Sequence, residues 1–109
     1  MTKNIKKLSD TQAREVAAML TFMKNNIEWT QFKHCNAFIS ATFERVRLNN
    51  GEALTVSAIK SYNTIVAFYD YDSQTLYEVG KYSRTTSKQI TQIFRCFFEN
   101  RSRVFVPCF

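Results

Sequence analysis

The residues whose types could do covalent or metal chemistry are the single histidine, His34, and three cysteines. A cysteine nucleophile needs a base within reach, but His34 and Cys35 are adjacent, and adjacent side chains of a strand point to opposite faces. Cys96 and Cys108 complete a Cys3His set by count, yet zinc sites draw their ligands from close pairs, which these cysteines do not form. We therefore expect no catalytic residue, no metal and no cofactor, with His34 partly buried and the cysteines as small core residues.

Acidic residues and glycines also give no catalytic pattern. The chain lacks paired carboxylates, triads and the glycine-rich loops of nucleotide-binding enzymes. Asp70 and Asp72 stand close together, but an EF-hand loop needs further acids and a glycine. The segment 70–74 is therefore expected to be a tight turn, and the chain is not expected to be an enzyme.

A stretch of hydroxyl side chains and cations runs from residue 81 to residue 90, KYSRTTSKQI. Thr86 followed by Gln89 is the capping-box pattern of a helix start, and apolar residues follow at helical spacing: Ile90, Ile93, Phe94 and Phe97. The unpaired amides and the dipole of a helix start attract anions. The residues predicted to contact a partner or phosphate are Lys81, Tyr82, Arg84, Thr85, Lys88 and Arg95, with Tyr62 as a further aromatic anchor. The alternative is an ordinary structural cap with solvated cations.

The positive charge is concentrated in the last quarter of the chain. Residues 1–80 carry nine Lys/Arg and eight Asp/Glu, whereas residues 81–109 carry six and one. A cluster of one sign on one element indicates an acidic or phosphate-bearing partner better than the total charge of +6 does.

Length and composition predict one domain, residues 1–109, with a flexible basic tail at residues 1–7. Hydrophobic residues make up 45% of the chain, which excludes a disordered protein. No apolar run approaches the roughly 18 residues of a membrane span, and the polar start resembles no secretory signal. The odd cysteine count favours reduced thiols, so we expect a cytoplasmic protein without membrane contact.

A first helix is expected from residue 10 to about residue 24. Ser9 and Gln12 form a capping box, the Asn25-Asn26 pair is a stop signal, and the buried stripe contains Val16, Met19, Leu20 and Met23, with Phe22 at its edge. Residues 27–35 are expected to be an aromatic connection over one end of the core.

Four strands are expected next, at residues 37–48, 54–58, 64–71 and 75–79, with a bulge near Glu44. Residues 49–51, Asn-Asn-Gly, predict a type I′ hairpin turn. Residues 64–71 are apolar at both odd and even positions, as in a central strand that is covered on both faces. A last strand at residues 104–106 is confined to a sheet edge by Pro107.

The expected fold class is therefore α+β, a single domain with an antiparallel sheet of four to five strands and two helices on one face. The chain order is helix, four strands, helix, strand. The sequence leaves open whether both faces of the central strand are covered within one chain or by a second copy in a homodimer.

Two segments carry a family resemblance, SYNTIVA at residues 61–67 and KYSRTTSKQI at residues 81–90. They are similar to a strand and helix start found in small uncharacterised proteins of bacteriophages and other mobile elements, over residues 54–94. The resemblance implies a phage or mobile-element setting in a bacterial cytoplasm, and no activity. Small phage proteins of this kind include inhibitors of host systems such as anti-CRISPR proteins. The topology is also similar to that of a double-stranded-RNA-binding domain, which reads duplex shape through phosphate and 2′-OH contacts.

Two functions follow as hypotheses. In the first, the chain is a non-enzymatic inhibitor or modulator that docks on a host protein or nucleoprotein, such as a CRISPR effector, through its basic helix start. In the second, it is a free nucleic-acid-binding module like a double-stranded-RNA-binding domain, whose affinity falls steeply with salt.

Overall fold

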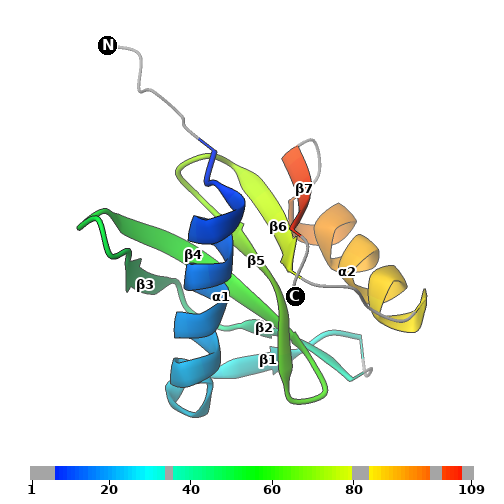
Figure 1. The fold of residues 1–109 in the computed structure, drawn as a ribbon. Coiled ribbons are helices and arrows are strands. Elements are labelled where there is room, and N and C mark those ends of the chain that lie inside the picture. The colour runs from blue at the N-terminus through cyan, green and yellow to red at the C-terminus, as the bar shows by residue number, and fades with distance from the viewer. Residues whose placement is uncertain (1–6, 34–35, 80–83, 99–101, 107–109) are drawn as a thin grey trace.

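The computed structural model describes residues 7–33, 36–79, 84–98 and 102–106, with the backbone alone for Arg84 and Thr85. Figure 1 shows two helices and one sheet. In chain order the elements are α1 (Asp10–Met23), a 3-10 helix (Lys24–Asn26), β1 (Trp29–Gln31), β2 (Ala37–Ser40), β3 (Glu44–Arg47), β4 (Ala53–Ser61), β5 (Thr64–Asp70), β6 (Thr75–Val79), α2 (Arg84–Phe97) and β7 (Ser102–Val106). No described helix is both long and apolar enough to cross a bilayer.

The seven strands form one sheet in the order β1-β2-β4-β5-β6-β7, with β3 also paired to β4. Neighbours are antiparallel except β6 and β7, which are parallel. The α+β class is confirmed, whereas four to five strands and a fully antiparallel sheet are wrong. The extra strands are β1, in the segment expected to be a connection, and a second strand within residues 37–48. The last strand lies at a sheet edge, as expected.

The expected strand at residues 37–48 is broken, not bulged. β2 pairs with the last part of β4 and β3 with its first part, which leaves residues 57–58 of β4 between the two ladders. The Ala58 amide donates to the Ser40 hydroxyl oxygen at 2.9 Å. A side chain thus satisfies a buried amide where the ladder is interrupted, and the chain can bend between β2 and β3.

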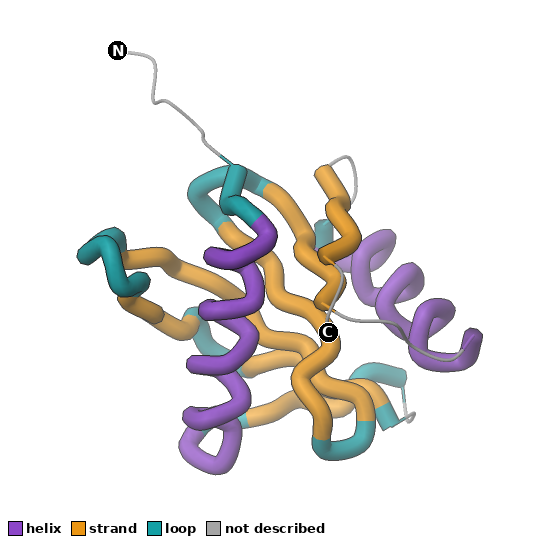
Figure 2. Tube along the Cα trace, viewed as in Figure 1, coloured by secondary structure: helices purple, strands orange, loops and turns teal. Residues whose placement is uncertain are grey.

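The two helices cover opposite faces of the sheet, so the expectation of both on one face is wrong (Figures 1 and 2). α1 buries Val16 and Leu20 against a core that contains Phe68, while α2 buries Ile90 and Ile93 against a core that contains Tyr69. β5 therefore supplies both cores from its two faces, as its apolar pattern predicted. One chain covers both faces, so β5 does not require a second copy.

The start of α1 is confirmed. The Gln12 amide donates to Ser9 Oγ at 3.2 Å and the Ser9 amide donates to Gln12 Oε1 at 3.0 Å, which is the complete capping box. The helix ends at Met23, and the expected edge residue Phe22 is 90% exposed.

The start of α2 differs from the expectation. The helix begins at Arg84, so Thr86 lies inside it and the capping box of Thr86 and Gln89 is wrong. The expected stripe also shifts at its end, because Phe97 is 56% exposed and Phe98 is buried. Phe98 stacks on Tyr69 with ring centroids 4.0 Å apart, and this contact draws the chain beyond the helix into the core.

The turn between β3 and β4 lies where Asn-Asn-Gly predicts it, but type I′ is wrong. The Gly51 amide donates to the Leu48 carbonyl oxygen at 2.9 Å, and Gly51 has a φ of +92° while the two asparagines keep negative φ values. This is a longer loop in which a type I turn is followed by a left-handed glycine. The turn after β5 is confirmed, with the Asp70 carboxylate accepting from the Asp72 amide and the Ser73 hydroxyl.

Candidate functional site

The structure places only part of the predicted contact set. Lys81 and Tyr82 lie outside the described residues, and Arg84 and Thr85 form the first turn of α2 by their backbone. The remaining residues are exposed: Tyr62, Lys88 and Arg95. His34, Cys35 and Cys108 are also outside the described residues. Cys96 is exposed, so its expected place in the core is wrong.

Lys88 and Arg95 lie on one face of α2. They are seven residues apart, which is about two helical turns, so both project on the same side. The opposite side of the helix holds the buried Ile90 and Ile93. Neither cation has a carboxylate partner among the described residues. The outer face of α2 therefore presents a short cationic strip.

A hydrogen bond between Ser61 and Gln89 joins this helix to the end of β4, where the turn to β5 begins. The Ser61 hydroxyl, which is buried, donates to Gln89 Oε1 at 3.1 Å. The two segments that carry the family resemblance thus meet in space, 28 residues apart in the chain. Sequence reasoning assigned Gln89 to a helix cap and missed this contact.

Tyr62 follows Ser61 in that turn and is held in an unusual backbone conformation. Its φ is +55° and its exposed fraction is 67%, while its amide donates to the Asn36 carbonyl oxygen at 2.7 Å. A bulky residue in the left-handed region costs free energy that glycine or asparagine avoids. Strained residues cluster at functional sites, so an exposed tyrosine at such a position is a candidate partner contact.

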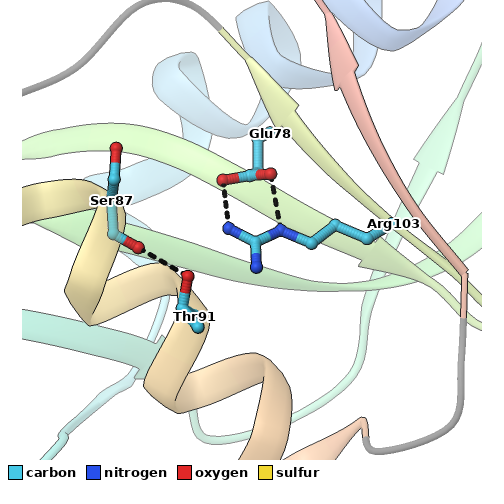
Figure 3. A network of polar contacts seen from close by, with 4 residues as sticks. All are labelled: Glu78, Ser87, Thr91 and Arg103. Carbon is cyan, nitrogen blue, oxygen red and sulfur yellow. Dashed lines mark hydrogen bonds and ion pairs between the residues drawn. The ribbon is translucent and has the colours of Figure 1, made fainter.

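Arg103 does not contribute to the cationic surface. Its Nε and one terminal nitrogen donate to the two Glu78 carboxylate oxygens at 2.6 and 2.7 Å (Figure 3), and its guanidinium lies 5.6 Å from the Phe94 ring centroid. The hydrogen bond to Glu78 raises the pKa of Arg103, although burial opposes it. One of the six cations in the last quarter is thus paired with a carboxylate of the chain itself. Figure 3 also shows the Thr91 hydroxyl donating to the Ser87 carbonyl oxygen at 2.9 Å.

An aromatic groove of about 690 Å³ opens between the end of α2 and the sheet. Its walls include Phe43, Tyr69, Tyr71, Phe97 and Phe98. Tyr71 packs edge to face against Phe43 and Tyr69, and Tyr69 stacks on Phe98. The Tyr71 hydroxyl lies 2.7 Å from the Ser57 hydroxyl. Apart from the many aromatic residues, no sequence pattern predicted this groove. Its described lining holds no carboxylate, histidine or cysteine, so it can bind an apolar or planar group without a catalytic residue.

The comparisons with known proteins give a family without an assigned activity. A family model described as "Family of unknown function (DUF8033)" matches residues 4–104. No curated protein matches the chain, and no solved structure matches it either. The expectation of an uncharacterised family is confirmed at this level, and the phage and anti-CRISPR setting stays a prediction.

Proposed function

We propose that this chain, which belongs to the family of unknown function DUF8033, is a non-enzymatic binding protein that docks on an acidic or phosphate-bearing partner through α2 and Tyr62. The observation that carries the proposal is the contact between Ser61 and Gln89, which fixes an exposed tyrosine beside a helix whose exposed cations form no ion pair within the described part of the chain. In the setting that the resemblance implies, the partner is a host protein or nucleoprotein such as a CRISPR effector, and docking inhibits or modulates it.

The chemistry of this surface fits protein recognition. Interfaces depend on a few aromatic and arginine anchors surrounded by polar contacts, and Tyr62 and Arg95 supply both types. Lys88 steers an acidic partner and raises the association rate at low salt. Because the Tyr62 amide is hydrogen-bonded and its backbone is fixed, burying Tyr62 costs mainly the entropy of its two side-chain torsions.

The free nucleic-acid binder has less support. Its likeness to a double-stranded-RNA-binding domain depended on the expected topology, with both helices on one face of an antiparallel sheet. In the structure α1 and α2 cover opposite faces. Free nucleic-acid binding therefore remains as a competing outcome of the experiment.

The experiment compares three forms of the full chain as bait in bacterial lysate treated with nuclease. The wild type is expected to retain a partner that the variant Lys88→Glu with Arg95→Glu loses. The control, Arg45→Glu with Arg47→Glu, makes the same charge change on β3 and is expected to retain this partner.

A titration of the purified chain against duplex DNA and RNA at two salt concentrations tests the alternative. Saturable binding whose log–log slope with salt is about 0.9 for each phosphate neutralised on DNA would contradict the proposal and support a nucleic-acid module. Equal capture of the partner by all three baits would also contradict it.

A further inference from the structure

β3 has an open edge. It pairs with β4 on one side, and no described strand pairs with its other side. Figure 1 shows β3 at the margin of the sheet beside α1, which it contacts. Open edges present unpaired backbone groups that can pair with another chain.

The backbone groups that face outward can be assigned from the hairpin. The Leu48 amide donates to the Glu52 carbonyl oxygen at 2.8 Å and closes the ladder. In an antiparallel ladder alternate residues face the partner strand, so Glu44 and Val46 point their backbone groups to β4. The N–H and C=O groups of Arg45 and Arg47 therefore point to the open edge.

An apolar groove of about 410 Å³ runs beside this edge, between α1 and β3. Its apolar lining consists of Ala18, Met19, Phe22, Met23 and Val46. Phe22 is 90% exposed, although it lies on α1, whose other side packs against the core. Methionines adapt their shape to a bound side chain, so the groove suits an apolar anchor.

The same edge carries positive charge. The Arg45 and Arg47 side chains are exposed and, within the described residues, neither has a carboxylate partner. The one acidic residue at the groove, Glu15, accepts a hydrogen bond from the Asn49 amide at 2.6 Å. β3 also carries Glu44, whose carboxylate accepts from the Thr42 hydroxyl at 3.0 Å. A partner segment beside β3 therefore meets two guanidinium groups that form no ion pair within the described residues.

We propose that β3 is a docking edge for an extended segment of a partner protein in which apolar and acidic residues alternate. Side chains directly opposite each other on paired strands share a face. Residues opposite Val46 would thus enter the groove beside α1, and residues opposite Arg45 and Arg47 would bring carboxylates to the guanidinium groups. Strand addition supplies affinity through the backbone, and the alternate side chains supply specificity. This surface is separate from the α2 surface proposed above.

A second copy of the chain fits this edge poorly. Two β3 strands paired antiparallel would bring Arg45 and Arg47 of one copy opposite those of the other, and like charges directly opposite each other are destabilising. The charge on the edge thus selects an acidic partner segment over self-association.

The probe is a random library of peptides of about ten residues, displayed on phage and selected on the full chain. The expected result is enrichment of sequences with alternating apolar and acidic residues. A synthetic enriched peptide is expected to bind Arg45→Glu with Arg47→Glu about tenfold or more weakly than the wild type. The matched control, Lys88→Glu with Arg95→Glu, is expected to bind it with unchanged affinity. Circular dichroism verifies that both variants fold.

A second measurement tests the backbone pairing. N-methylation of the peptide amides at alternate positions is expected to abolish binding for one parity only, because only alternate amides of an added strand face β3. Enriched peptides without the alternation, or equal affinity for both charge variants, would overturn the proposal. A wild-type dimer in solution that Arg45→Glu with Arg47→Glu converts to a monomer would overturn it in favour of a second copy.

Discussion

The Ser61 hydroxyl donates a hydrogen bond to Gln89 Oε1 across 3.1 Å, and this contact joins the end of β4 to α2. Ser61→Ala removes the donor inside the fold and should lower the free energy of unfolding by about 0.5–1.5 kcal/mol. Urea denaturation measures this. Ser87→Ala, at an exposed position of α2, should leave stability equal or slightly higher because alanine favours helix. Equal stability of Ser61→Ala and the wild type would show that the contact is not formed in solution.

Tyr62 offers a test of whether backbone strain serves binding. Asparagine adopts positive φ more readily than tyrosine, so Tyr62→Asn should raise the free energy of unfolding by about 0.5–1 kcal/mol while it weakens partner capture. Gln74→Asn is the matched control, because Gln74 is exposed and has a φ of +52°. Gln74→Asn should raise the free energy of unfolding by a similar amount and leave partner capture unchanged. Capture unchanged by Tyr62→Asn would remove Tyr62 from the interface.

Local features of the fold could be predicted from the sequence. The Ser9 capping box involves residues three apart, and β6 runs from Thr75 to Val79 as its pattern and flanking turn predict. β5 is apolar at both odd and even positions because it lies between the two cores. Each of these signals is contained in a short window, where spacing alone determines which side chains share a face.

Features that depend on distant partners could not be predicted. The side of the sheet on which α2 packs is set by the crossover from β6 to the parallel β7, which no local pattern reports. β1 has three residues, too few to show alternation.

The candidate site was predicted only in part for the same reason. Counting the cations of a sequence assumes that each one can contact a partner. Arg103 instead forms an ion pair with Glu78, 25 residues away in the chain. Lys88 and Arg95 are exposed on α2, and their contact with a partner stays a prediction. The open edge of β3 was invisible in the sequence, because it depends on β2 and β3 sharing one side of β4.

Buried and exposed apolar residues should respond differently to truncation. Ile93 is fully buried between α2 and the sheet, so Ile93→Ala should cost about 2–5 kcal/mol through lost packing and a cavity. Phe22→Ala removes a side chain that is 90% exposed and should change stability by no more than about 0.5 kcal/mol. Thermal denaturation measures both. A large loss of stability for Phe22→Ala would mean that Phe22 is packed in the fold, and Phe22 would then not be free to contact a partner in the groove between α1 and β3.

The ion pair between Arg103 and Glu78 should stabilise the parallel pair β6–β7. Arg103→Met keeps the bulk beside Phe94 but leaves Glu78 without its bidentate partner, and the partial exposure of both groups limits the expected loss to about 1–2 kcal/mol. Arg103→Lys should recover only part of this loss, because lysine cannot form two parallel hydrogen bonds to one carboxylate.

The stability lost in Arg103→Met should not depend on pH between about pH 7 and about pH 10. The hydrogen bond to Glu78 raises the pKa of Arg103, and a raised pKa in the folded state contributes stability that is fully present below the unfolded-state value. That value lies above any pH at which the measurement is made. The difference between the wild type and Arg103→Met, measured by urea denaturation, should therefore be equal at about pH 7 and about pH 10. A difference that shrinks over this interval would show that a group other than Arg103 carries the pH dependence.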